Sequence, residues 1–492
     1  MSLDTLTVDA YQLTTLVAHA DAGRTHAAMA MAFFFRKLPR NRNYVLFCGL
    51  RQILEHAAAM RFDAGDLEML LADPLLGPPL ASRPSLVAAL RALDGFDGEI
   101  DALPDGTPAF GGPALRTDGR RFTVGDTRIG IYTPLMQVRT DLLRAKLIET
   151  PWLGRINYLS MVASKATRVV EAARGKPVLE FGARRMHPAA AIDASYAAWI
   201  AGSAATSNLA AQRKWGVPVA GTMDHFFVQA TEQIGEKWPE SERAAFAQYY
   251  RAFPGNSIML VDTYDTEDGV RHAVEATGAK LTGIRLDSNV TPATVARARR
   301  ILDEMGAGQA KIFVSDGLDE FRVAELDGAD GYGVGENITC SPDAAAGIGA
   351  VAKLTVNGYG KLTMKLARGT GKATLPGELQ VHRFADHDLV ALADEPVASN
   401  GRKLLQPVWR GRSPIAPPTP AQARAYAREQ IAALPPALRA LETPTTRPAS
   451  ARAPAPSTTT EATAAAAAPL WPLVASDGLV AKVEQLMKES FA

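Results

Sequence analysis

The chain has 492 residues, of which 47% are hydrophobic and 21% are charged, a balance typical of a globular protein with two or three domains. Its 53 lysines and arginines nearly equal its 52 aspartates and glutamates, and the resulting net charge of +1 argues against a nucleic-acid-binding protein with its usual basic excess. We therefore expect no nucleic acid among its main partners.

The two cysteines, Cys48 and Cys340, exclude a disulfide framework and a thiolate metal site, and they fit a reducing compartment. Residues 1–11 lack a basic segment followed by an apolar one, so they do not read as a signal peptide. The most apolar run, residues 27–35, is too short for a membrane span, which takes about 20 residues. A soluble, cytoplasmic protein without membrane contact is the expectation.

Residues 1–125 predict an N-terminal α/β domain. A helix is expected over residues 9–22, and an apolar run follows over residues 27–35. Arg36 and Lys37 end this apolar run.

Residues 126–355 alternate short apolar runs with helical patterns, and we expect a catalytic domain here. The expected strands are residues 177–181, 217–221, 257–261, 281–286, 311–314 and 331–334. The expected helices include residues 189–201, 266–277 and 292–305, the last of which starts at the N-cap pair Thr291 and Pro292. This rhythm is typical of a parallel sheet with helices outside it, and six units favour an irregular β/α barrel over an open sheet.

Polar residues directly follow the expected strands: Arg184, Arg185, His225, Asp262, Asp287, Asp316 and Glu336. In a β/α barrel these positions meet at the carboxyl ends of the strands, where active sites lie. Each residue taken alone is as readily a loop residue that starts a helix. Several of them at one face favour a functional site.

The C-terminal third predicts strands over residues 350–356, 377–384 and 388–393. We expect residues 356–412 to pack back on the N-terminal domain, which gives a second α+β domain built from both ends of the catalytic region. Residues 413–470 are rich in Pro, Ala and Thr and predict a linker, disordered over 443–469, with room for one helix near residues 420–433. Residues 471–492 predict a short amphipathic helix.

Six motifs carry a family resemblance when they are taken in chain order. They are DAYQLT at residues 9–14, FFRKLP at 34–39, EFGARR at 180–185, GTMDH at 221–225, RLDS at 285–288 and TLPG at 374–377. As an ordered series, they resemble the nicotinate phosphoribosyltransferase family over residues 3–394. The Pro- and Thr-rich tail lies outside the resemblance.

The resemblance implies an irregular α/β barrel, a split second domain and a homodimer with sites at the interface. It also implies a reaction in which nicotinate attacks C1 of phosphoribosyl pyrophosphate, giving nicotinate mononucleotide and pyrophosphate for NAD supply. Mg²⁺ and ATP would take part, since many members couple the reaction to ATP hydrolysis through a phosphorylated histidine.

His225 matches the histidine that the family phosphorylates. A lone histidine is more often a structural residue, and only the motif favours the catalytic interpretation. An imidazole accepts a phosphoryl group well when a carboxylate holds its other nitrogen. The resemblance indicates Asp262 as that carboxylate, and it assigns Asp287, together with Ser288, to the ribose and pyrophosphate.

Arg184 and Arg285 match arginines that approach the substrate carboxylate and the phosphates, and the alternative for each is an ordinary salt bridge. Phe181 and Tyr11 match rings that sandwich the pyridine, with Tyr11 supplied by the partner subunit, although a phenylalanine at a strand end is most often a core residue. Thr222 matches a threonine near the pyridine carboxylate.

Ser207 bears on the choice between acid and amide, because relatives that use nicotinamide have an aspartate at its position. A serine can donate to a carboxylate that an aspartate would repel, so Ser207 favours nicotinate, although it is equally readily a helix N-cap. Weaker candidates for phosphate contacts are Arg36, Lys37, Gly335 and Lys372. The sequence assigns no metal ligands.

Two departures from the family pattern leave other functions open. The family turn Asp-Ser-Gly-Asp continues after Ser288 as Asn289 and Val290, so a glycine and a carboxylate are lost, although asparagine tolerates a positive φ. Glu336 stands where relatives carry a small hydroxyl residue near the 5′-phosphate. It can point away, bind Mg²⁺ or indicate another substrate. The alternatives are therefore an enzyme for another nitrogen heterocycle or phosphorylated sugar, and a non-catalytic paralogue that senses pyridine nucleotides.

Overall fold

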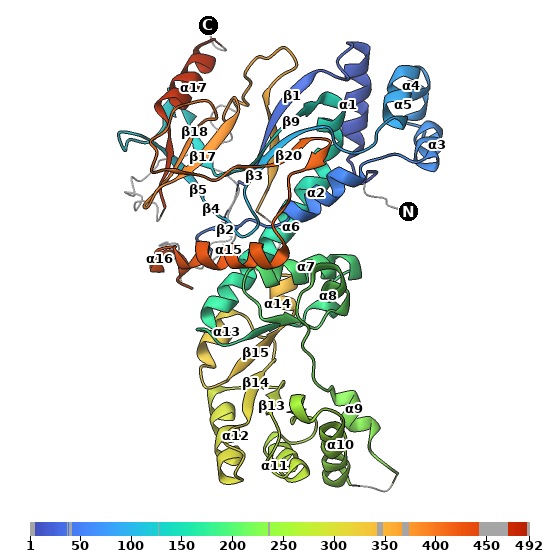
Figure 1. The fold of residues 1–492 in the computed structure, drawn as a ribbon, viewed down its shortest axis with the longest axis vertical. Coiled ribbons are helices and arrows are strands. Elements are labelled where there is room, and N and C mark those ends of the chain that lie inside the picture. Colours follow the sequence, from blue (N-terminus) through green and yellow to red (C-terminus); the bar gives the residue numbers. More distant parts are fainter. Residues whose placement is uncertain are drawn as a thin grey trace, which may run out of the picture.

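The computed structural model describes residues 5–36, 38, 42–125, 127–234, 237–341, 348–366, 373–441 and 471–489. Within these residues the chain forms three six-stranded sheets, one in the lower part of Figure 1 and two in the upper part. No helix of the described ranges has both the length and the apolar character needed to cross a bilayer.

The lower sheet is parallel, as the alternating pattern predicts. Its strand order is β11-β10-β15-β14-β13-β12. The strands are β10 (Val178–Glu180), β11 (Ala205–Thr206), β12 (Ile258–Leu260), β13 (Gly283–Leu286), β14 (Lys311–Val314) and β15 (Gly331–Val334). The helices that connect or flank them are α7 (Pro188–Ile200), α8 (Leu209–Trp215), α9 (His225–Ala230), α10 (Trp238–Ala252), α11 (Thr266–Thr277), α12 (Pro292–Glu304), α13 (Glu320–Glu325) and α14 (Glu336–Thr339).

This sheet and the helices α10, α11 and α12 in the lower part of Figure 1 form the parallel β/α part of the irregular barrel that the sequence predicts, and among the described strands the edge strands β11 and β12 do not pair with each other. The expected strand over residues 217–221 is reduced to a single parallel bridge between Val219 and Thr206. Pro218 lacks a backbone N–H and so cannot donate to a ladder. From the other side, Asn256 Nδ2 donates to the carbonyl of Gly221 at 3.0 Å, which links this segment to the region before β12.

Local signals start several of these helices where the sequence predicts. Thr291 Oγ1 accepts from the backbone N–H of Thr294 at 3.1 Å, so α12 begins with the predicted cap followed by Pro292. Asp265 caps α11 in the same way, and Gly278 ends it in the left-handed conformation. Helices α11 and α12 therefore closely follow the predicted ranges.

The upper part joins strands from the two ends of the chain. One sheet is antiparallel, with β16 (Val351–Val356), β1 (Ala28–Phe34), β9 (Pro134–Asp141), β3 (Gly98–Ala102), β20 (Gln406–Gly411) and β21 (Ser413–Pro414) in that order. Beside it lie α1 (Ala10–Asp21), α2 (Leu50–Ala59), α3 (Ala64–Ala72), α4 (Gly77–Ala81) and α5 (Pro84–Arg91). The 31-residue helix α6 (Leu142–Ala172) leads from β9 to the barrel.

The other upper sheet has the order β19-β17-β18-β22-β5-β8. Its strands are β5 (Gly111–Arg116), β8 (Gly130–Tyr132), β17 (Leu379–Arg383), β18 (Asp388–Leu392), β19 (Arg402–Lys403) and β22 (Leu473–Ala475). Two further strand pairs are small: β2 (Val45–Leu46) with β4 (Pro108–Ala109), and β6 (Thr123–Val124) with β7 (Thr127–Arg128). Each upper sheet therefore combines strands from the N-terminal and the C-terminal parts of the chain. The domain boundaries themselves stay predictions.

The C-terminal tail is more ordered than its composition indicates. Residues 413–441, which the sequence assigns to a linker, form β21, α15 (Pro420–Ala432) and α16 (Pro436–Arg439), and the predicted helix near residues 420–433 is confirmed by α15. Ala427, Ile431 and Leu438 are buried, so this segment packs against the body of the protein. The predicted disorder over residues 443–469 lies outside the described residues.

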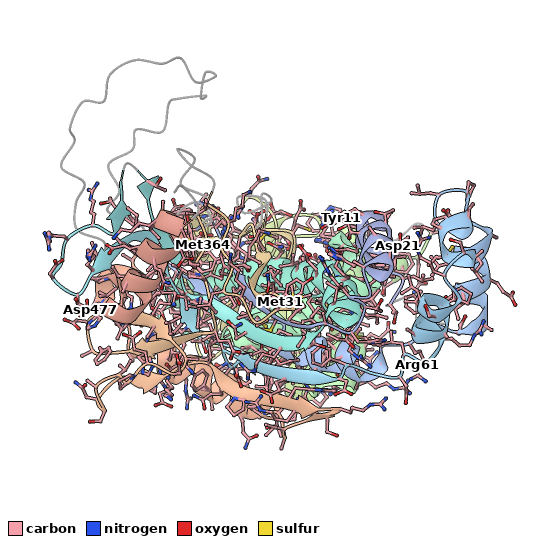
Figure 2. The ribbon with its side chains drawn as sticks, turned by 90° about the horizontal axis from the view of Figure 1, so that it is seen from above. Tyr11, Asp21, Met31, Arg61, Met364 and Asp477 are labelled. Carbon is pink, nitrogen blue, oxygen red and sulfur yellow. The ribbon has the colours of Figure 1, made fainter. Side chains whose placement is uncertain are left out.

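The end of the chain contains a strand that the sequence did not predict. β22 pairs in parallel with β18 and β5, and the predicted terminal helix follows it as α17 (Asp477–Glu489). Viewed from above, Asp477 at the start of α17 and Tyr11 on α1 lie in different regions of the upper part (Figure 2).

Candidate active site

A cavity of about 680 Å³ opens at the carboxyl ends of the parallel strands. Segments after β10, β11, β13, β14 and β15 contribute to its wall, together with residues of α9 and α10. The predicted site residues in the wall are Phe181, Arg184, Ser207, Thr222, Arg285, Asp287 and Gly335. Their convergence follows from the parallel topology, because the carboxyl ends of such strands lie at one face.

Phe181 lies over β15. Its backbone N–H donates to the carbonyl of Val334 at 2.9 Å, and a Cβ atom on Gly333 would lie 2.6 Å from its ring. A methyl group has no room there, so the absence of a side chain at Gly333 leaves the space that the ring occupies. The phenylalanine is thus a cavity residue rather than a core residue.

Glu180, directly before this ring, is a buried carboxylate that the sequence did not single out. It accepts hydrogen bonds from the backbone N–H of Gly182, from Ser195 Oγ at 2.7 Å and from Thr206 Oγ1 at 2.6 Å. Three donors compensate its burial and tie together the ends of β10 and β11 and the helix α7. In the sequence, the signal that could have identified Glu180 is a charged residue inside an otherwise apolar run.

Arg285 projects from β13 into the cavity. Its Nη1 donates to Thr222 Oγ1 at 2.7 Å, while its Nε is buried and has no hydrogen-bond partner among the described residues. Burial lowers the pKa of the Arg285 guanidinium, an effect that nearby carboxylates such as Asp287 oppose. A partly buried guanidinium in a cavity wall can bind an anionic group by short, charge-assisted hydrogen bonds.

His225 opens α9 and is held by a residue other than the one predicted. Nδ1 lies 3.1 Å from Thr263 Oγ1, and Nε2 lies 3.9 Å from Asp287 Oδ2. The expectation that Asp262 holds the histidine is wrong for this structure. Asp262 turns instead toward the end of β13, where its Oδ2 accepts from the backbone N–H of Asp287 at 2.8 Å. The next residue along the chain, Thr263, faces the imidazole in its place.

Asp287 is oriented from two sides. Ser315 Oγ donates to its Oδ1 at 2.7 Å, and its Oδ2 faces His225. The turn that follows keeps its shape, since Asn289 has a φ of 50°, in the left-handed region that asparagine tolerates. Val290 is buried, and its backbone N–H donates to Asp316 Oδ2 at 2.8 Å.

Glu336, the second departure from the family pattern, lies at the cavity wall beside a cation. Its Oε2 is 3.6 Å from Arg185 Nε, and both side chains are exposed. The arginine partly offsets the negative charge that Glu336 brings to the site. Arg185 also lines the cavity, although no role was assigned to it from the sequence.

An aromatic group forms another wall of the cavity, and sequence reasoning missed it. Phe227 of α9 stacks edge-on with Tyr249 of α10 at 6.0 Å between ring centroids, and Tyr249 lies 5.1 Å from Phe253. Phe227 and Tyr249 come from helices and Phe253 directly follows α10, so none of these rings comes from a strand end. No motif marked them in the sequence.

The remaining predicted residues do not line the cavity within one chain. Ser288 is exposed beside Asp287, and Arg36 lies near Tyr132 and Lys353. Tyr11 is 52% exposed on α1, in the upper part of the molecule (Figures 1 and 2). Lys37 and Lys372 lie outside the described residues.

Comparisons with known proteins agree with this site. The model of the nicotinate phosphoribosyltransferase (NAPRTase) family matches residues 177–355, the barrel strands and their loops. The chain is 37% identical to nicotinate phosphoribosyltransferase pncB2 of Mycobacterium tuberculosis, with 89% of each chain covered. It is 30% identical to human nicotinate phosphoribosyltransferase, with 82% of each covered.

Two solved structures resemble the fold. The crystal structure of human nicotinic acid phosphoribosyltransferase matches with a TM-score of 0.76 at 25% identity, covering 97% of this chain and 99% of that one. Nicotinate-nucleotide pyrophosphorylase from Pyrococcus furiosus matches with a TM-score of 0.66 at 23% identity, over 88% of this chain and 96% of that one, a likeness that concerns the fold alone.

The barrel and its arginine-lined cavity are those of an enzyme of the phosphoribosyltransferase class. Given the identity to its relatives over most of its length, the chain belongs to the nicotinate phosphoribosyltransferase family.

Proposed function

We propose that this enzyme transfers the phosphoribosyl group of phosphoribosyl pyrophosphate to nicotinate, in the supply of NAD. The lone pair of the pyridine nitrogen forms a bond to C1 of the ribose. The C1–O bond to pyrophosphate breaks, and pyrophosphate leaves with the electron pair. The observation that carries the proposal is the guanidinium of Arg285 in the cavity wall beside Thr222, whose Nε has no partner among the described residues.

Nicotinate is favoured over nicotinamide by the donors of this wall. Arg285 supplies a cation, and Ser207 is exposed to the cavity with a hydroxyl that can donate to a carboxylate. Phe181 supplies one flat face for a pyridine ring. A neutral amide would gain less from a buried guanidinium than a carboxylate does.

A magnesium ion would enter with the pyrophosphate group. Within the described residues no three His, Cys, Asp or Glu side chains are grouped to hold a metal ion by themselves. Mg²⁺ often binds through one or two carboxylates together with substrate phosphates, and Asp224 and Asp287 are carboxylates in the cavity wall that fit this mode. Bound there, the ion would offset the charge that develops on the leaving group.

ATP would phosphorylate His225. With Nδ1–H donating a hydrogen bond to Thr263 Oγ1, the lone pair of Nε2 is free to attack the γ-phosphorus, and the bond to ADP breaks as the P–N bond forms. The threonine would thus set the tautomer, the part that the sequence assigned to Asp262. Hydrolysis of the phosphohistidine would drive the overall reaction toward the mononucleotide.

The working unit would be a homodimer. Tyr11 is exposed on α1 and lies outside the cavity of its own chain, so it would supply its ring of the pyridine sandwich to the cavity of a partner subunit. A cytoplasmic location also stays a prediction.

The two departures from the family pattern give little support to a different substrate. Asn289 adopts the conformation that the missing glycine would allow, and Arg185 faces the carboxylate of Glu336. Another heterocycle or a sensing role is therefore the weaker alternative.

The test is pyrophosphate release by the purified full chain with phosphoribosyl pyrophosphate and Mg²⁺. Nicotinate and nicotinamide are compared, each with and without ATP. We expect release with nicotinate, faster with ATP, and little with nicotinamide. Equal rates with both pyridines would contradict the assigned specificity, and no release from folded dimeric protein would contradict the activity.

A further inference from the structure

A second cavity, of about 340 Å³, lies between α6, α7 and α15, and it shares no lining residue with the catalytic cavity. Val170, Ile200 and Ile431 give it an apolar wall, and arginines stand along α15 and α16. Its size falls within the range of small-molecule sites in proteins.

The positive charge of this cavity exceeds its negative charge. Arg439 Nη1 donates to Glu171 Oε2 at 3.0 Å, which engages the carboxylate among the described lining residues. Arg424 and Arg428 also line the cavity, four residues apart on α15, where like charges repel. Burial and the nearby Arg428 both lower the pKa of Arg424. Among the described residues Arg428 has no hydrogen bond or ion pair, whereas Arg424 donates to backbone carbonyls, so Arg428 is the arginine of this cavity that an anion can pair with.

Arg424 connects this cavity to the end of α7. Its guanidinium donates to the carbonyls of Trp199, of Ser203 at 2.7 Å and of Gly202 at 3.0 Å. The chain then continues directly to Thr206, which donates to Glu180, and to Ser207 in the catalytic wall. A ligand that changes the position of Arg424 would therefore change its hydrogen bonds to the segment that leads into the wall of the catalytic cavity.

We propose that the cavity between α6, α7 and α15 is an effector site for an organic phosphate with a flat apolar body, of the size of a nucleoside monophosphate. A phosphate dianion offsets the charges of Arg424 and Arg428, and the guanidinium of Arg428 can bind it by paired hydrogen bonds. The apolar body packs on Ile200 and Ile431. This site is distinct from the catalytic cavity, because the two cavities share no lining residue.

The test is calorimetric titration of the full chain with AMP as the probe. Arg428→Ala removes an exposed arginine of the site, and Arg300→Ala removes an exposed arginine of α12 as the matched control. We expect Arg428→Ala to weaken AMP binding by about tenfold or more, the loss typical of a charged hydrogen-bond pair. Arg300→Ala and the catalytic-cavity variant Arg285→Ala should leave it unchanged, and AMP should slow hydrogen exchange in α15 and at the end of α7.

Several outcomes would overturn the proposal. One is a dissociation constant for AMP weaker than about 1 mM, which corresponds to little specific binding energy. Another is binding lost in Arg285→Ala and kept in Arg428→Ala, which assigns AMP to the catalytic cavity. If inorganic phosphate bound as tightly as AMP, the apolar body would have no role in binding. If benzoate bound more tightly than AMP, the ligand of the site would be a carboxylate rather than a phosphate. Because the readout is binding, a failure here is distinct from a failure of the proposed activity.

Discussion

Arg285 is the side chain on which recognition of the substrate carboxylate depends. It is partly buried, it donates to Thr222, and its buried Nε has no partner among the described residues. Replacing it by alanine removes a charge-assisted contact worth about 1.5–3 kcal/mol. We expect Arg285→Ala to raise the KM for nicotinate at least about tenfold. Steady-state kinetics check this, with Arg300→Ala as a control, and an unchanged KM would remove the assigned role.

The ring of Phe181 depends on the missing side chain of Gly333. In Gly333→Ala the new methyl group would lie 2.6 Å from the ring, whereas Gly221, also in the cavity wall, has open space around the equivalent position. We predict a higher KM for nicotinate in Gly333→Ala and a nearly normal KM in Gly221→Ala. Similar KM values in the two variants would mean that the ring does not contact the substrate.

Thr263 rather than Asp262 contacts the imidazole of His225, so the threonine hydroxyl should control the tautomer. We predict that Thr263→Val lowers the acid-labile ³²P label from γ-labelled ATP and the stimulation by ATP, and that Thr263→Ser retains both. His225→Ala should abolish the label. A normal label in Thr263→Val would show that the hydroxyl is dispensable, and a label that persists in His225→Ala would place the phosphoryl group elsewhere.

At the scale of elements, the turn after β13 depends on a residue that tolerates a positive φ. Asn289 has a φ of 50°, and an alanine in this region costs about 1 kcal/mol. We predict a lower apparent Tm for Asn289→Ala and no loss for Asn289→Gly, measured by thermal unfolding. A loss of stability in Asn289→Gly equal to that in Asn289→Ala would mean that the asparagine side chain, and not its backbone, holds the turn.

Much of the barrel could be predicted because its signals are local. Short apolar runs, the cap at Thr291 and the polar residues after strands depend on neighbouring residues in the sequence. The choice between Asp262 and Thr263 could not be predicted in this way, because the direction of a side chain in a turn depends on packing against α9 and β13. The aromatic wall of α9 and α10 could not be predicted for the same reason, because aromatic residues in a helix are usually interpreted as core residues.

At the scale of the whole molecule, the C-terminal strand β22 joins the two halves of one upper sheet. β22 lies between β18 and β5, and both pairings are parallel and span long separations in sequence, so no local pattern could predict them. Leu473 is 2% exposed, whereas Val474 is partly exposed on the other face of the strand.

Replacing these two neighbouring residues of β22 by alanine should therefore lower the free energy of unfolding by different amounts. Leu473→Ala leaves a cavity in the core and should cost about 2–4 kcal/mol, while Val474→Ala should cost clearly less. Thermal unfolding of the two variants measures the difference. Equal apparent Tm values would mean that β22 adds little to the stability of the upper sheets.

The most direct test of the central claim is a competition between the two pyridines in one reaction. The full chain is incubated with phosphoribosyl pyrophosphate, Mg²⁺, ATP and equal amounts of isotopically labelled nicotinate and nicotinamide, and the mononucleotides are identified by mass spectrometry. We predict that nicotinate mononucleotide is the main product, in equal amount to pyrophosphate, and that Arg285→Ala loses this preference. Nicotinamide mononucleotide as the main product, or neither mononucleotide from folded protein, would contradict the account.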